Sequence, residues 1–131
     1  MNDPPYRERS VKELRRACRW ALKKLHVDNW NVTLFFDDKA SDHPILQALD
    51  GNMAGVVVRP QTLEAIMGVW RETCHSSDVD PLCVTFHECI HIVQWWQFTE
   101  AGEKIEDFLW QQSCNRFAWL LYEIWEWEYD E

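Results

Sequence analysis

The stretch PLCVTFHECIHIVQWWQF, residues 81–98, decides how the chain is organised, because it predicts a buried helix that carries two histidines. Pro81 suits the first turn of a helix, where a backbone N–H would have no partner anyway. Apolar side chains recur through residues 82–95 and predict that the helix is buried. His87 and His91 stand four positions apart, so they share one face of that helix.

His87-Glu88-Cys89-Ile90-His91 is an H-E-x-x-H motif, a pattern with a defined chemistry. Two imidazoles one helical turn apart can bind the same tetrahedral zinc ion. The zinc lowers the pKa of a bound water and polarises a scissile carbonyl, while the glutamate accepts the proton of the water. The motif therefore predicts Zn²⁺ as a cofactor, His87 and His91 as ligands, and Glu88 as the general base. Cys89 is expected to be a packed core thiol.

Upstream of the motif the sequence predicts one helix and three strands. Ser10 and Glu13 form a capping box at the start of an amphipathic helix over residues 10–26. Residues 39–52 have the composition of turns and loops. Alternating β-branched and aromatic side chains predict strands over residues 30–36, 53–58 and 64–70.

Downstream of the motif, a turn over residues 99–102 leads into a last helix over residues 103–127. The predicted fold is α+β, with an N-terminal helix, a three-stranded and mostly antiparallel sheet, the H-E-x-x-H helix and an antiparallel backing helix. A length of 131 residues predicts a single domain spanning residues 1–131. Aromatic residues make up 14% of the chain, which excludes disorder; Trp125 and Trp127 are candidates for an exposed interface.

The charge and cysteine content exclude several classes of protein. A net charge of −9 argues against a nucleic-acid partner, because neutralising phosphates supplies most of that affinity. The apolar runs are too short for a membrane span. Five cysteines without a C-x-x-C pair, behind an N-terminus unlike a signal peptide, indicate reduced thiols in a cytoplasmic protein.

A third zinc ligand is expected from the last helix, because the other histidines all precede the motif, namely His26, His43 and His75. If the two long helices are antiparallel neighbours, the turn between them places His91 opposite residue 111. The face of the last helix at that level carries Asp107, Gln111, Asn115, Ala118 and Tyr122.

The motif together with QQSCNRFAWLL, residues 111–121, resembles the gluzincins, in particular the small ImmA/IrrE-type and phage-borne zincin-like proteins. The resemblance covers residues 10–125 in the order of elements, and only the two long helices in specific residues. It implies a minimal zincin-like fold. In that family a glutamate on the second helix is the third ligand, with an aspartate or asparagine four residues later to support it; these positions fall on Gln111 and Asn115.

A glutamine where the family has a glutamate leaves three interpretations open. Gln111 or Gln112 ligates zinc through a neutral amide oxygen. Alternatively, a carboxylate ligates after a shift along the helix, the candidates being Asp107, Glu106 and Glu123. In the third interpretation the chain keeps the fold with little activity.

We therefore expect a zinc-dependent metallopeptidase, with zinc held by His87, His91 and Gln111 and with Glu88 as the catalytic base. Its substrate would be a peptide or protein, and the strand at residues 53–58 could pair with an extended peptide if it lies at the sheet edge. The alternative is a catalytically degenerate zincin-fold binding module, encoded by a phage or mobile element, that acts through a protein partner.

Overall fold

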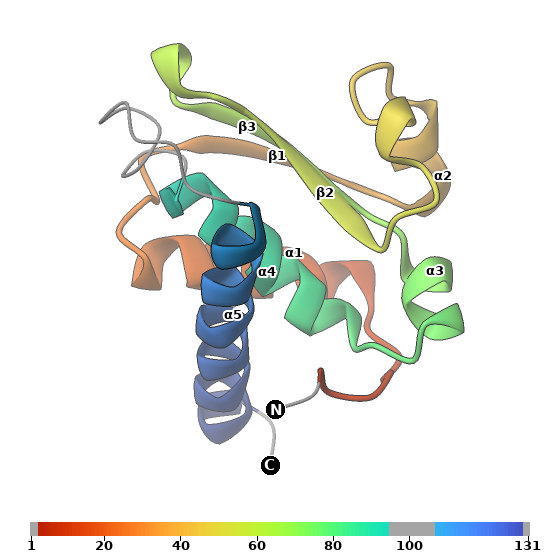
Figure 1. Cartoon of the computed structure of the whole chain (residues 1–131), viewed down its shortest axis with the longest axis vertical. Coiled ribbons are helices and arrows are strands. Elements are labelled where there is room, and N and C mark those ends of the chain that lie inside the picture. The colour runs from red at the N-terminus through yellow and green to blue at the C-terminus, as the bar shows by residue number, and fades with distance from the viewer. Residues whose placement is uncertain (1–2, 95–106, 130–131) are drawn as a thin grey trace.

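The fold of the computed structural model, which describes residues 3–94 and 107–129, consists of a three-stranded sheet with two long helices on one face and a third long helix against them (Figure 1). The long helices are α1 (Val11–Lys24), α4 (Pro81–Gln94) and α5 (Asp107–Tyr129). The strands are β1 (Asn31–Phe36), β2 (Ala54–Arg59) and β3 (Glu64–Val69). The short helices are α2 (Asp37–Asp42) and α3 (Arg71–Ser76), with 3₁₀ turns η1 (Gln47–Leu49) and η2 (Pro60–Thr62). The α+β class predicted from the sequence is confirmed.

The sheet is mixed, so the prediction of a mostly antiparallel sheet was wrong. The strand order is β1-β3-β2, with β3 parallel to β1 and antiparallel to β2. Phe36 at the end of β1 and Ala54 at the start of β2 both stand beside Val69. The chain between β1 and β2 therefore crosses one end of the sheet. After the turn at η2, strand β3 pairs with both earlier strands and lies between them. This insertion makes β1 and β2 the two edges.

Helix α1 begins where the sequence predicts. The Ser10 hydroxyl accepts a hydrogen bond from the backbone N–H of Glu13 at 3.0 Å, the first half of the expected capping box. Leu14 and Cys18 are buried on its inner face. The Sγ atoms of Cys18 and Cys89 lie 3.7 Å apart, so α1 packs closely on α4.

The short helices were not predicted, because their stability comes from distant contacts. The prediction of a loop over residues 39–52 missed α2 and η1, and α3 follows β3 directly. Ala40, Leu46 and Trp70 form a small buried cluster, and the Trp70 indole donates a hydrogen bond to the Ser41 hydroxyl at 2.8 Å. The Asp37 carboxylate accepts a hydrogen bond from the backbone N–H of Arg71 at 2.9 Å. These pairings join segments far apart in the sequence and stabilise helices too short to form alone.

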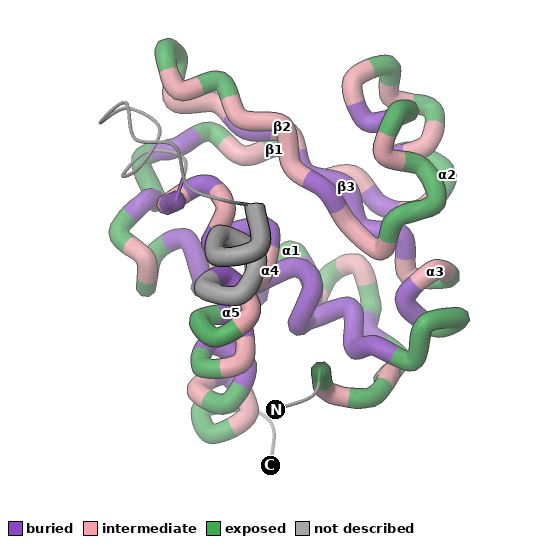
Figure 2. The backbone as a smooth tube through the Cα atoms, viewed as in Figure 1, coloured by how far each residue is buried: buried purple, intermediate pink, exposed green. Residues whose placement is uncertain are grey.

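Helix α4 is the central element of the core. It contacts β2, β3, α1 and α5, and it is buried along nearly its whole length (Figure 2). The H-E-x-x-H residues lie within this helix, as predicted. The predicted helix extended to residue 98, and residues 95–98 lie outside the described part of the chain, as do the predicted turn at 99–102 and the start of the last helix.

A buried ionic network fixes the start of α4. Asp80 accepts a hydrogen bond from the backbone N–H of Leu82 at 3.0 Å and so caps the helix. The Arg9 guanidinium donates to both oxygens of the same carboxylate, at 3.1 and 2.8 Å. The Tyr122 hydroxyl of α5 donates to it at 2.7 Å. One fully buried carboxylate thus ties the N-terminal segment, α4 and α5 together, and it sets how α5 lies against α4.

The two tryptophans predicted as an exposed interface have opposite surroundings. Trp127 is 87% exposed, as predicted, whereas Trp125 is 1% exposed and packs against the rings of Trp20 and Phe86. The prediction for Trp125 was therefore wrong, because the face of α5 toward α1 includes this residue. Among the described helices, none is both long and apolar enough to cross a membrane.

Candidate metal centre

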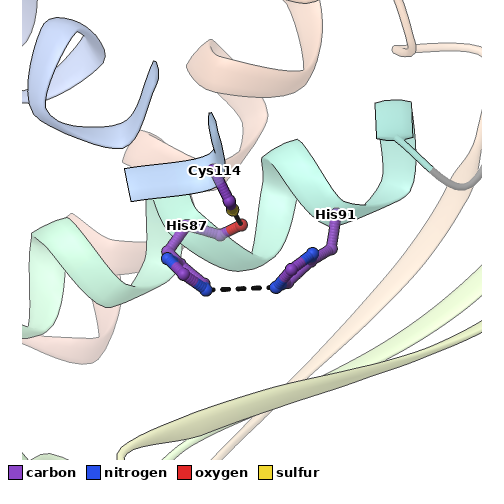
Figure 3. Close-up of side chains that lie close together, drawn as sticks. All are labelled: His87, His91 and Cys114. Carbon is purple, nitrogen blue, oxygen red and sulfur yellow. Dashed lines mark hydrogen bonds between the residues drawn. The ribbon is translucent and has the colours of Figure 1, made fainter. Parts of the chain in front are cut away.

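The rings of His87 and His91 lie side by side on one side of α4 (Figure 3). Their Nε2 atoms are 3.0 Å apart, and the ring planes are nearly perpendicular, at 82°. Two nitrogens bound to one tetrahedral zinc at about 2.0–2.1 Å stand about 3.3 Å from each other. The observed separation is close to that value, so the two imidazoles can reach the same ion with little movement.

Gln94 orients one of these rings. The Nδ1 atom of His91 lies 3.0 Å from the Oε1 atom of Gln94, one turn further along α4. In the tautomer that donates this hydrogen bond, the Nε2 atom of His91 presents its lone pair toward His87. Metal-bound histidines commonly have such a partner on their second nitrogen. Gln94 was not predicted to have this role, although its i+3 spacing from His91 places the two side chains on neighbouring turns of the helix.

Cys114 of α5 completes a group of side chains that could hold a metal ion (Figure 3). One ligand atom from each of Cys114, His87 and His91 can be chosen so that all three lie within 4.8 Å of one another. The thiol also donates a hydrogen bond to the backbone carbonyl of His87 at 2.9 Å. Two imidazoles and one thiol are a donor set that suits zinc and related transition metals. Cys114 was not predicted from the sequence as a ligand, because the cysteines were interpreted as reduced thiols.

Glu88 is buried beside the histidines. Its side chain is 8% exposed, and burial raises the pKa of the carboxyl from its ordinary value to about 8. Desolvation disfavours the charged carboxylate, which explains the direction of the shift. In the metal-free protein the buried carboxyl group therefore keeps its proton to a higher pH than an exposed glutamate does.

A cleft of about 710 Å³ opens beside the candidate centre. His87, Glu88 and His91 line one wall from α4, and Asn115 of α5 contributes a polar group to the same cleft. The opposite wall is β2, whose residues 54–58 all line the cleft. Since β2 is an edge of the sheet, an extended chain in this cleft would run beside a strand edge and close to the two histidines.

The residues predicted to supply the third ligand lie mostly outside the part of the chain that the structure describes. Glu106 and the side chains of Asp107, Gln111 and Gln112 lie outside the described residues, although α5 includes positions 107–112 in its backbone. Glu123 is exposed on α5. Asn115, which the resemblance assigns a supporting role, lines the cleft with the motif residues.

Comparisons of the chain with protein-family models, with curated proteins and with solved structures found no match. The fold and the site define an α+β protein with a candidate metal centre on its central helix.

Proposed function

We propose that the protein is a zinc-dependent hydrolase of peptide bonds. The observation that carries the proposal is the geometry of the two histidines of α4. Their Nε2 atoms lie 3.0 Å apart, and the Nδ1 atom of His91 contacts Gln94. An H-E-x-x-H sequence within a buried helix supports the same reading, because the glutamate is then held beside the ion. The resemblance to small gluzincins adds the expectation of zinc as the metal.

The roles of the side chains follow from their places in the cleft. Zinc, when bound by His87 and His91, supplies a Lewis acid that polarises a carbonyl and acidifies water. Glu88 lines the same cleft. A bound cation would favour its ionised form, and the carboxylate would then accept a proton from the attacking water and pass it to the leaving amine. Asn115 offers an amide group that can orient the substrate or a ligand.

The substrate class follows from the edge strand. An extended peptide can add to β2 through backbone hydrogen bonds, which need no particular side chain. Val56 and Val58, whose side chains share one face of β2 and pack against the main core, line part of the cleft and would favour apolar groups in the peptide. We therefore propose a peptide or a flexible protein segment as the substrate. The five free and buried cysteines support a reducing environment, such as the cytoplasm.

The test is zinc content and peptidase activity of untagged protein. We expect one zinc per chain, together with cleavage of an unfolded protein substrate that a chelator abolishes. His87→Ala should lose both, and Glu88→Gln should keep zinc and lose cleavage. His26→Asn is the matched control, since His26 is exposed and its left-handed backbone at φ 59° suits asparagine. Absence of zinc, with His87→Ala unchanged in stability and activity, would overturn the proposal.

A second candidate function is a catalytically degenerate binding module that acts through a protein partner. The specific observation in its favour is Gln111, a neutral residue at the position where the resemblance places an anionic ligand. The substitution Gln111→Glu separates the two candidates. A gain of zinc affinity with new peptidase activity indicates a degenerate site. Loss of an existing activity indicates that Gln111 itself is a functional zinc ligand.

A further inference from the structure

Helix α5 brings a thiol to the level of His87. Cys114 is fully buried between α5 and α4, and its Sγ atom lies 2.9 Å from the backbone oxygen of His87. The same residue belongs to the group with His87 and His91, whose ligand atoms fall within 4.8 Å of one another. Figure 3 shows the thiol approaching α4 beside the paired rings.

We propose that Cys114 is the third protein ligand of the metal centre, in place of the glutamate of the resembling family. This inference rests on the proposed zinc site. When the ion binds, the thiol proton leaves to solvent, the hydrogen bond to the His87 carbonyl breaks, and a sulfur lone pair forms the new bond to the ion. The protein then supplies two neutral imidazoles and one thiolate.

The distances require only a small adjustment. Zinc–sulfur and zinc–nitrogen bonds of about 2.3 and 2.0–2.1 Å place sulfur about 3.5 Å from each nitrogen in a tetrahedral site. The ligand atoms already lie within 4.8 Å of one another, so a movement of about 1 Å would bring them to the distances of a tetrahedral site. Rotation of the Cys114 side chain about its Cα–Cβ bond would supply such a movement.

Charge gives a second reason for the assignment. A site of two imidazoles and an amide is neutral, and Gln111 adds no anion to it. The thiolate of Cys114 supplies the negative charge that the glutamate supplies in the resembling family. As a soft ligand it favours zinc, cobalt or ferrous iron over magnesium or calcium.

Two other cysteines of α4 provide a contrast. Cys89 faces α1, where its sulfur lies 3.7 Å from that of Cys18. Cys83 lines the cleft one turn before His87. Within the described part of the chain, however, the group that could hold an ion includes neither of them. Cys83→Ser is therefore a control for the general effect of removing a buried thiol near the site.

The test replaces zinc with Co²⁺ in the full chain and records its absorption spectrum. A cobalt–thiolate bond produces an intense charge-transfer band in the near ultraviolet, separate from the visible bands that any cobalt site shows. We expect this band in the wild type and in Cys83→Ser, and its loss in Cys114→Ser, whose hydroxyl can still donate to the His87 carbonyl. Since losing a residue that only supports a ligand costs about 10- to 100-fold in metal affinity, Cys114→Ser should lose at least about tenfold.

The outcomes separate this inference from the proposed function. Cobalt bound through His87 without the charge-transfer band, or with a band that Cys114→Ser leaves intact, overturns the role of Cys114 and leaves the metal site standing. Reduced affinity in Gln111→Ala but not in Cys114→Ser assigns the third position to Gln111 instead. No cobalt or zinc bound by the wild type overturns both.

X-ray absorption of the zinc-loaded wild type provides a measurement that does not depend on any variant folding. One sulfur at about 2.3 Å, beside nitrogen or oxygen ligands, is the expected result. A coordination shell of nitrogen and oxygen alone would overturn the inference even if Cys114→Ser proved unstable.

Discussion

The Nδ1 atom of His91 and the Oε1 atom of Gln94 lie 3.0 Å apart across one turn of α4. The contact holds the imidazole so that its Nε2 atom lies 3.0 Å from that of His87. Gln94 is only 5% exposed, so its amide oxygen is a fixed acceptor that solvent does not replace. The geometry of the histidine pair therefore depends on a residue outside the motif.

Replacing Gln94 with leucine should weaken zinc binding about 10- to 100-fold, because His91 then loses the acceptor that fixes its tautomer and ring orientation. Gln94→Glu retains an acceptor at the same distance and should restore most of the affinity. Competition with a chromophoric chelator measures the change, with circular dichroism to verify folding. Equal zinc affinity in Gln94→Leu and the wild type would show that the contact has no influence on the site.

Tyr122→Phe should destabilise the protein by about 2 kcal/mol at neutral pH, since a hydrogen bond to a charged acceptor is lost. Burial, together with the hydrogen bond to Asp80, raises the pKa of the Tyr122 hydroxyl well above its ordinary value of 10.0. The unfolded chain therefore releases the phenol proton first. This contribution to stability is fully present below pH 10 and is lost as the pH rises through the higher folded-state pKa.

Urea unfolding at pH 7 and above pH 10 tests the Tyr122 prediction. The stability difference between the wild type and Tyr122→Phe should shrink at the alkaline pH. Tyr129→Phe is the control, because Tyr129 is 42% exposed. A difference that stays constant or grows above pH 10 would contradict the assigned direction of the pKa shift.

Trp125 and Trp127 offer a matched pair of substitutions two positions apart. Trp125→Ala should cost about 3–5 kcal/mol, because it empties a buried site against Trp20 and Phe86. Trp127→Ala should change stability by less than about 0.5 kcal/mol, since the side chain is 87% exposed. Chemical denaturation measures both values, and Trp125→Phe gives a milder variant if the alanine variant does not fold. Similar losses of stability in the two alanine variants would show that α5 is rotated differently about its own axis.

In the folded, metal-free protein all five cysteines should be reduced and should react slowly with thiol reagents. Each is buried, and burial raises the pKa of the Cys74 and Cys83 thiols to about 12, so neither is a thiolate at neutral pH. A bulky disulfide reagent should react slowly with the native chain and with five thiols after denaturation. Fewer than five thiols in protein denatured without a reductant would reveal a disulfide.

Local sequence patterns predicted most of the elements that build the site. The capping box at Ser10 and Glu13 identified the start of α1, and alternation of side chains identified β3 at Glu64–Val69. The i, i+4 spacing of His87 and His91 predicted their shared face on α4. Each of these features depends on residues within a few positions of one another, which is why composition and periodicity were sufficient.

Tertiary structure alone decided the rest. The insertion of β3 between β1 and β2, the burial of Trp125 and the approach of Cys114 to His87 all join segments distant in the sequence. Side-chain periodicity reports which face of an element is apolar, but not which other element covers that face or in what rotation. The sequence by itself therefore determined a helix with two histidines on one face. The packing of α5 on α4, anchored at Asp80 by the Tyr122 hydroxyl, decided which side chain stands beside them.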